Sequence, residues 1–144
     1  MSRTVLVLNG PNLNRLGVRE PDVYGHTTFE QLSQMCRDAA ASHGFAADVR
    51  QTNDEAQLIN WLHEAADQGW PVVLNPAAFT HYSYALRDAC AMLTEPLIEV
   101  HLSNPAAREE FRHNSVISGV ATGTIAGFGV DSYLLALEQI ARMG

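Results

Sequence analysis

The stretch Thr4–Gly25, TVLVLNGPNLNRLGVREPDVYG, sets the pattern for the whole chain. It opens with an apolar run, Thr4–Leu8, that is typical of a buried parallel strand. A helical pattern begins only near Thr28, so the strand is followed by a loop of roughly fifteen residues or more, Asn9–Gly25. Such connections are usually about two to six residues long. Polar side chains capable of chemistry fill this loop, which predicts that it closes over a ligand.

The same loop has features that favour order over disorder. Two prolines, Pro11 and Pro21, restrict its backbone. Apolar side chains alternate with the polar ones, and we expect them to anchor the loop. These side chains are Leu13, Leu16, Val18, Val23 and Tyr24.

Strand and helix patterns alternate along the rest of the chain. The predicted strands are Thr4–Leu8, Phe45–Thr52, Pro71–Leu74, Pro96–Leu102 and a small-residue strand within Ser115–Ala126. The first helix is predicted to start at Thr27 or Thr28, with a capping box to Glu30 or Gln31, and the second at Asn53 or Asp54. The third is predicted to run from about His81 to Leu93, and the last to start at Gly129 or Asp131. Between these two, Ala106–His113 is predicted to form a short charged helix or turn. This alternation predicts an α/β chain with a flavodoxin-like, doubly wound five-stranded parallel sheet of order 2-1-3-4-5 and helices on both faces. Residues 1–144 are expected to form a single catalytic domain.

The composition excludes several classes of protein. The net charge of −7 disfavours nucleic acid as a partner. All nine basic residues are arginines, so the chain has no lysine for a Schiff base or for a Walker phosphate loop. No apolar run approaches the length of a membrane span, and Met1–Asn9 lacks the pattern of a signal peptide, so we expect a cytoplasmic protein. Cys36 and Cys90 are expected to be buried thiols rather than a disulfide.

Chemically capable side chains follow three of the predicted strands. In the order 2-1-3-4-5 the first, third and fourth strands are neighbours, and ligands of such sheets bind beyond the carboxyl ends of the strands. We therefore expect one crevice to collect the side chains of Asn12, Asn75, His81, His101 and Ser103, with Arg108 and Arg112 within reach. Amide, imidazole, hydroxyl and guanidinium groups such as those of Asn75, His81, Ser103 and Arg112 suit a polyhydroxylated carboxylate.

The loop tyrosine and one histidine form a candidate acid–base pair. His101 can act as general acid or base, and Glu99, two residues earlier on the same side of its strand, can orient the imidazole. Tyr24 lies near Arg19 in the sequence, and guanidinium groups in a closed site can supply the roughly 3–4 kcal/mol that lowers the pKa of a phenol by about 2 to 3 units. With Asn12 holding an enolate oxygen, such a pair would catalyse elimination or enolisation.

Each of these residues also has a plainer interpretation. Tyr24 is explained equally by packing, His101 by a core position, and His81 by a helix cap. Asn75-Pro76 is typical of a turn, Asp88 of an exposed helix charge, and the charged segment 108–112 of a solvated face. A zinc site would need His81, His101 and His113, for which no short ligand spacing exists, and Ser118 lacks a nucleophile elbow.

Five blocks of sequence occur in order along nearly the full length. They are Leu8–Gly17 (LNGPNLNRLG), Arg19–Gly25 (REPDVYG), Asn75–Ala89 (NPAAFTHYSYALRDA), Glu99–Asn104 (EVHLSN) and Ala107–His113 (AREEFRH). In these blocks the chain resembles the type II 3-dehydroquinate dehydratases. The resemblance implies a flavodoxin-like fold, trimers assembled into a dodecamer, and reversible dehydration of 3-dehydroquinate to 3-dehydroshikimate in the shikimate pathway, without metal or organic cofactor.

The resemblance also implies a role for each matching residue. Tyr24 would remove a C2 proton with support from Arg19, Asn12 would help hold the enolate, and His101, oriented by Glu99, would protonate the departing C1 hydroxyl. Substrate-binding positions match Asn75, His81, Leu102, Ser103 and Arg112. Asp88 matches a position that reaches the site of a neighbouring subunit, and Arg108 matches a supporting position near the loop.

The chain departs from the usual pattern of this family at two places. Two other classes of flavodoxin-like protein would each need residues that the chain lacks. Pro105-Ala106 stands where an Ile-His pair or similar is usual, and Arg15 where leucine is frequent. A flavodoxin-like module that binds a nucleotide or flavin phosphate would need glycines or Ser/Thr in the first loop, which has asparagines and prolines instead. A receiver-like domain would need acidic residues after the first strand and a lysine after the fifth, and the chain has neither.

Overall fold

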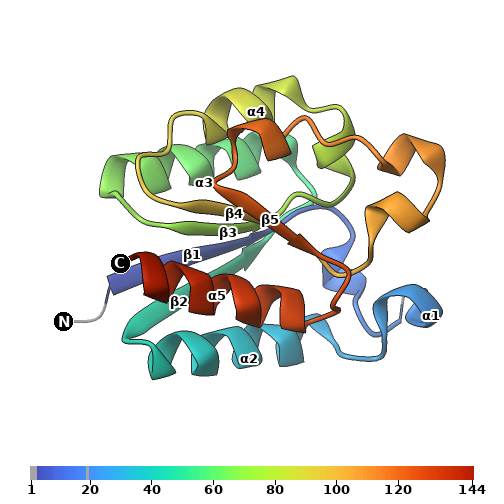
Figure 1. Cartoon of the computed structure of the whole chain (residues 1–144), viewed down its shortest axis with the longest axis horizontal. Coiled ribbons are helices and arrows are strands. Elements are labelled where there is room, and N and C mark those ends of the chain that lie inside the picture. Colours follow the sequence, from blue (N-terminus) through green and yellow to red (C-terminus); the bar gives the residue numbers. More distant parts are fainter. Residues whose placement is uncertain (1–2, 19) are drawn as a thin grey trace.

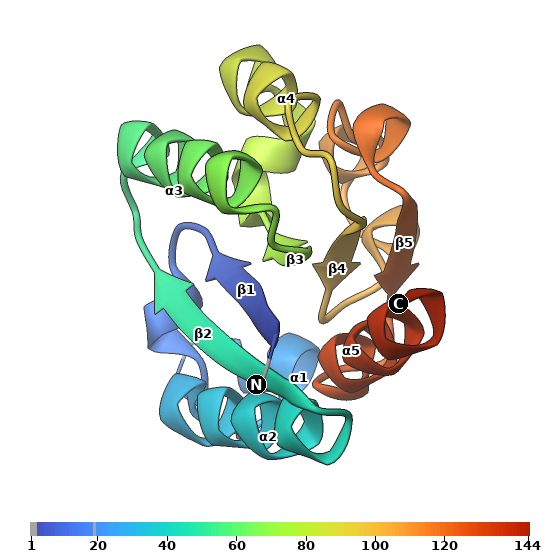
Figure 2. The same ribbon diagram turned by 90° about the vertical axis from the view of Figure 1, so that its left-hand side faces the viewer.

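The computed structural model describes residues 3–18 and 20–144, and for Tyr24 the backbone only. Its five strands are β1 (Arg3–Asn9), β2 (Phe45–Gln51), β3 (Val72–Asn75), β4 (Leu97–His101) and β5 (Gly123–Ala126). All neighbouring pairs are parallel, in the order β2-β1-β3-β4-β5. The predicted strand order is therefore confirmed (Figure 2).

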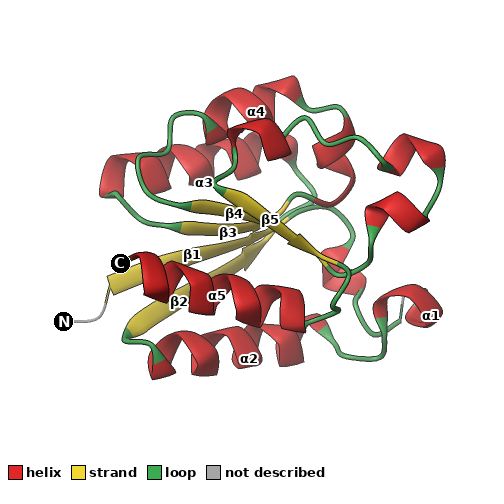
Figure 3. Cartoon of the chain, viewed as in Figure 1, coloured by secondary structure: helices red, strands yellow, loops and turns green. Residues whose placement is uncertain are grey.

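The helices cover both faces of the sheet. They are α1 (Pro21–Tyr24), α2 (Phe29–Ser42), α3 (Glu55–Gln68), α4 (Tyr84–Cys90) and α5 (Asp131–Met143). Helices α3 and α4 lie on one face, and α2 and α5 on the other (Figures 1 and 3). The alternation of side chains along β1 explains both layers, because Val5 and Val7 pack against α2 and α5 while Leu6 and Leu8 pack against α3 and α4.

Local sequence signals set the bounds of two helices. Thr28 caps α2, because its hydroxyl accepts from the Gln31 amide at 3.1 Å while the Gln31 side chain accepts from the Thr28 amide at 2.9 Å, the predicted capping box. Asp54 caps α3, and Gly69 ends it with a left-handed φ of 69°. Within the part of the chain that the model describes, no helix is long and apolar enough to cross a membrane.

Both predicted ends of the third helix were wrong, whereas the prediction for the last strand was correct. The third helix does not start at His81, because residues Ala77–His81 form a 3-10 turn and the better capping residue Ser83 starts α4 instead. It ends at Cys90, before the predicted Leu93. The small-residue strand predicted within Ser115–Ala126 is confirmed as β5, whose four residues pair with β4 after a turn at Ser115–Ser118.

The long first loop contains structure of its own. Leu13 and Leu16 are buried in the core, as expected of anchors, but Val18 and Val23 are 74% and 42% exposed, so their predicted anchoring role was wrong. The loop also includes a 3-10 turn at Leu13–Arg15 and the one-turn helix α1, which Pro21 opens. In Figure 1 α1 lies beyond the carboxyl ends of the strands, on the same side as the segment that follows β4.

Both cysteines are free and buried, as expected. Cys36 lies in the core against α5, and Cys90 lies on the opposite face of the sheet. Burial raises the pKa of each thiol to about 12, so both remain protonated and unreactive at neutral pH.

Candidate active site

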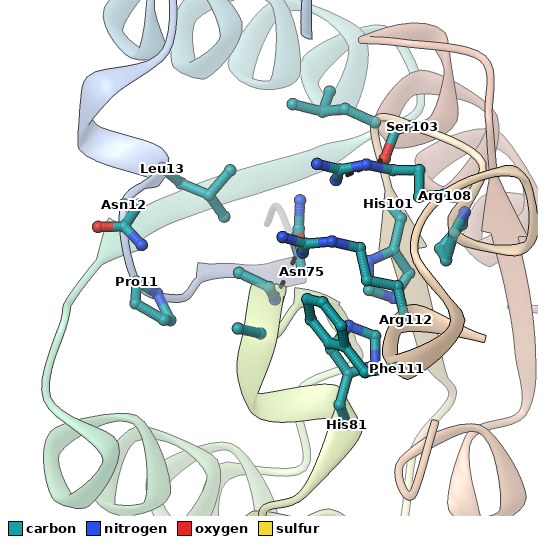
Figure 4. Close-up of a pocket in the computed structure, with 14 residues that line it drawn as sticks. Pro11, Asn12, Leu13, Asn75, His81, His101, Ser103, Arg108, Phe111 and Arg112 are labelled. Carbon is teal, nitrogen blue, oxygen red and sulfur yellow. Dashed lines mark hydrogen bonds between the residues drawn. The ribbon is translucent and has the colours of Figure 1, made fainter. Parts of the chain in front are cut away.

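A cleft opens beyond the carboxyl ends of β1, β3 and β4, where the strand order reverses (Figure 4). The cavity has a volume of about 220 Å³. Its lining includes all the side chains expected to converge and Leu102, that is Asn12, Asn75, His81, His101, Leu102, Ser103, Arg108 and Arg112. In Figure 4 the guanidinium groups of Arg108 and Arg112 extend into the space between Leu13 on one wall and His101 on the other. The predicted convergence is confirmed.

The pair at the end of β4 has the predicted geometry. His101 Nε2 lies 2.6 Å from Glu99 Oε2, and the Glu99 side chain is fully buried. Burial opposes ionisation of this carboxyl, yet hydrogen bonds from His101, Ser118 and Thr80 outweigh it and hold its pKa below the usual range. With Nε2 donating to the carboxylate, Nδ1 is the imidazole nitrogen that can exchange a proton with a ligand.

Three hydroxyl groups around Glu99 escaped the sequence reasoning. Thr80 and Ser118 each donate to one carboxylate oxygen at 2.6 Å, and Ser115 donates to both at 3.1 Å. A buried carboxylate requires such donors, so a carboxylate inside an apolar strand was itself a signal to search for them. The sequence could not identify which of the many Ser and Thr residues they were, because they come from two segments that are distant from Glu99 along the chain.

Asn75 is held by a buried network that spans the sheet. Its Nδ2 donates to Tyr133 Oη at 2.9 Å, and its Oδ1 accepts from the Ala77 amide at 3.0 Å. Tyr133 in turn donates to Asn9 Oδ1 at 2.6 Å, and its burial raises the pKa of the phenol. These contacts fix the Asn75 amide at the floor of the cleft with one Nδ2 hydrogen left for a ligand.

The wall formed by the first loop is close to β3. Gly10 donates to the Asn75 carbonyl at 2.8 Å, and a Cβ on Gly10 would lie 2.7 Å from the Pro76 carbonyl oxygen, so only glycine fits there. Asn12 has a left-handed φ of 72°, and its backbone N–H donates to Asn53 Oδ1 at 2.9 Å. Asn53, which sequence reasoning missed, therefore ties the loop to the start of α3.

The cationic groups of the cleft are held by neighbours. Arg108 lies 3.4 Å from Ser103 Oγ and 3.6 Å from Glu20 Oε2, which joins the segment after β4 to the first loop. Arg112 is paired with Glu109 at 3.0 Å and stacks on the Phe111 ring at 4.6 Å. These contacts orient both guanidinium groups, so the cleft is suited to a carboxylate.

His81 and the segment Pro105-Ala106 lie at the edge of the cleft. His81 Nδ1 donates to the Asn114 carbonyl at 2.7 Å, which leaves Nε2 as an acceptor for a ligand hydroxyl. Pro105 starts a short 3-10 turn and lines the cleft, and Asn104 Oδ1 accepts from the Ala106 amide at 3.2 Å. The substitution therefore leaves this segment regular and next to Ser103.

Two predicted site residues cannot be placed relative to this cleft, and a third does not line it. Arg19 and the Tyr24 side chain lie outside the described residues, although the Tyr24 backbone ends α1. The Asp88 side chain is 73% exposed on α4, pairs with Arg87 at 3.6 Å and does not line the cavity of its own chain. His113 Nε2 donates to the Arg108 carbonyl at 3.0 Å, and residues 3–18 and 20–144 contain no group of three His, Cys, Asp or Glu side chains that could hold a metal ion.

The chain matches known proteins over nearly its whole length. The family model "Dehydroquinase class II" matches residues 3–141. A 3-dehydroquinate dehydratase of Salinispora tropica is 61% identical over 95% of this chain and 96% of the relative, and 3-dehydroquinate dehydratase 2 of Pseudomonas aeruginosa is 55% identical over 99% and 96%. The crystal structure of a type II dehydroquinase from Propionibacterium acnes superimposes with a TM-score of 0.97 at 53% identity, covering 99% of this chain and 98% of that one. The chain therefore belongs to the class II dehydroquinase family.

Proposed function

We propose that this protein is a lyase that reversibly dehydrates 3-dehydroquinate to 3-dehydroshikimate, a step of the shikimate pathway. The observation that carries the proposal is the hydrogen-bonded pair of His101 and the buried Glu99 at the end of β4, with His101 lining the cleft, in a chain of the class II dehydroquinase family. No metal or organic cofactor is required in the proposed reaction, and a Schiff base is excluded because the chain has no lysine.

The elimination proceeds through an enolate, with loss of the proton and the hydroxyl from opposite faces. The Tyr24 phenolate, supported by Arg19, takes the C2 proton, and the electron pair of that bond moves into the carbonyl as an enolate. Asn12 holds the enolate oxygen by hydrogen bonding. The enolate then collapses with cleavage of the C1–O bond, and His101 protonates the departing hydroxyl, which leaves as water.

Binding of the substrate uses the other groups of the cleft. Arg112 pairs with the substrate carboxylate, supported by its stacking on Phe111. Asn75, His81 and Ser103 hydrogen-bond its hydroxyls, and the backbone around Leu102 contributes beside them. Arg108 supports the loop through its ion pair with Glu20.

We also propose that residues 1–144 form one catalytic domain that works in the cytoplasm and assembles into trimers and then a dodecamer. Support comes from the exposed face around α4, where Tyr82, Tyr84 and Met92 are 58%, 70% and 55% exposed beside Asp88. Contiguous exposed apolar side chains are typical of an interface between copies. Asp88 then reaches the cleft of a neighbouring subunit. Sedimentation of Asp88→Ala tests this role, since an unaltered and fully active assembly would contradict it.

The function is tested by absorbance at the conjugated-enone band while purified protein is mixed with 3-dehydroquinate. We expect the absorbance to rise at the same rate with and without borohydride, because no imine forms that borohydride could trap. A preparation of His101→Ala made in the same way is the control for contaminating activity. A folded wild-type protein that gives no rise would refute the proposed function.

A further inference from the structure

The carboxylate of Glu99 has more donors than orienting one histidine requires. Oε2 accepts from His101 and Thr80, each at 2.6 Å, and Oε1 accepts from Ser118 at 2.6 Å. Ser115 adds bonds of 3.1 Å to both oxygens. We call Thr80, Ser115 and Ser118 the hydroxyl cage. Its members come from the turn after β3 and from the turn before β5.

Two backbone amides set the direction of these bonds. Ser115 Oγ accepts from the amides of Ile117 at 3.1 Å and Ser118 at 3.0 Å, which occupies both of its lone pairs. Its hydrogen is therefore available for Glu99. Thr80 Oγ1 lies 2.5 Å from Ser115 Oγ, whose lone pairs are both occupied, so Thr80 accepts from Ser115 in that contact and directs its own hydrogen to Glu99 Oε2 at 2.6 Å. A hydroxyl cage that only donates matches an ionised carboxylate and not a protonated one.

The turn that holds these serines is tied to the rest of the cage. The Val116 amide donates to the Thr80 carbonyl at 2.7 Å, and Thr124 on β5 lies 3.5 Å from Ser118 Oγ. These backbone bonds hold the two serine hydroxyls in place beside Glu99.

The hydroxyl cage does not touch the cleft where the substrate binds. Its three members line a second cavity of about 180 Å³ behind His101 and are absent from the lining of the first. His101 lies between the two cavities and lines both. A change in the hydroxyl cage therefore acts on the substrate through Glu99 and His101 and not by direct contact.

We infer that Ser118, together with Thr80 and Ser115, is a positioning residue of this enzyme, which locks Glu99 as an oriented anion so that His101 presents Nδ1 to the departing hydroxyl. The inference rests on the proposed function. It assigns catalytic importance to the turn before β5, which neither the sequence motifs nor the matching blocks include.

Several other groups that titrate or carry charge face Glu99. His101 follows on the same strand, and the Cys90 thiol approaches from α4, where the Glu99 charge contributes to its raised pKa. His81, Arg112 and His113 line the second cavity. Of these groups only His101 is hydrogen-bonded to the carboxylate among the described residues, so the hydroxyl cage supplies its remaining stabilisation.

The test compares Ser118→Ala with Ser118→Thr, which keeps the hydroxyl. Loss of one bond to a charged group corresponds to a fall in kcat of about tenfold. We expect that fall in Ser118→Ala, with KM changed less than about twofold. Because the pKa of Glu99 is lowered in the native protein, removal of a donor raises it, and the acid limb of the kcat profile should move up by about one pH unit. Ser118→Thr should restore both.

Thr80→Val and Thr80→Ser form a second pair with the same expectation. Ser33→Ala is the matched control, since this buried serine on α2 bonds the Phe29 carbonyl at 2.8 Å and is not part of either cavity. An unchanged kcat in Ser118→Ala would overturn the inference. So would a fall in kcat with the acid limb unmoved, because that pattern indicates only structural damage.

An infrared difference titration of the Glu99 carboxyl stretch, assigned with Glu99→Gln, separates this inference from the proposed function. The midpoint should be higher in Ser118→Ala than in the wild type even if the wild type does not dehydrate 3-dehydroquinate. An inactive wild type with that shift would refute the function alone. Equal midpoints in an active wild type would refute the hydroxyl cage alone.

Discussion

The two walls of the cleft are built in different ways. The wall at the end of β4 presents His101 from a strand, bonded to a fully buried carboxylate that three hydroxyls surround. The wall made by the first loop presents Asn12 from the start of a 3-10 turn with a left-handed backbone, held by the bond to Asn53, the Gly10–Asn75 backbone bond and the burial of Leu13. His101, the proposed acid, is thus positioned by the fold itself, whereas the groups of the loop depend on a few anchoring contacts.

This difference matters for a reaction that moves two protons. An acid on a rigid strand meets the departing hydroxyl in one geometry, which suits general acid catalysis. A base on a loop of this length can close after the substrate has bound and then exclude water. We therefore expect substitutions on the two walls to differ in size and in which kinetic parameter they change.

The largest effect is expected from Tyr24→Phe, on the loop wall. Only the proton acceptor is lost, so kcat should fall by about 10³-fold or more while the affinity for 3-dehydroquinate changes little. Turnover and equilibrium binding of the substrate measure the two quantities separately. Activity close to that of the wild type would show that Tyr24 is not the base.

A smaller but severe effect is expected from His101→Ala, on the strand wall. The acid is lost, and kcat should fall by about 10²-fold or more. The Glu99 carboxylate keeps its three hydroxyl donors, so the melting temperature should change little. His63→Ala, at an exposed position of α3, is the matched control for loss of an imidazole. Near wild-type turnover by His101→Ala would remove His101 as the acid.

The smallest effect is expected from Asn53→Ala, which removes an anchor of the loop wall without touching the cleft. It breaks the 2.9 Å bond to the Asn12 amide and the 3.1 Å bond from Gln51. A single neutral hydrogen bond corresponds to a loss of roughly threefold to tenfold in kcat/KM. Asn60→Ala, at an exposed position of the following helix α3, is the control for loss of an asparagine side chain. An unchanged kcat/KM would show that the bond from Asn12 to Asn53 does not position the loop wall for catalysis.

The strand wall was more predictable from the sequence than the surroundings of its carboxylate. Glu99 and His101 lie two residues apart on one strand, and the period of a strand places them on the same side. Their hydroxyl donors are separated by 19, 16 and 19 residues from Glu99 along the chain. No local pattern relates such positions, so Thr80, Ser115 and Ser118 became visible only in the folded chain.

The sequence by itself determined the strand order, limited two helix caps to neighbouring pairs that include Thr28 and Asp54, and indicated the polar side chains that line the cleft. These follow from hydrophobic periodicity, local hydrogen bonds and a topological rule, all of which act over short stretches of chain or depend only on the order of elements. Tertiary structure alone decided that Val18 and Val23 are exposed, that α4 begins after Ser83, and that Asn53 ties down the loop. It also assembled the hydroxyl cage around Glu99, because a buried charge takes its partners from whichever segments the packed fold brings within hydrogen-bond distance.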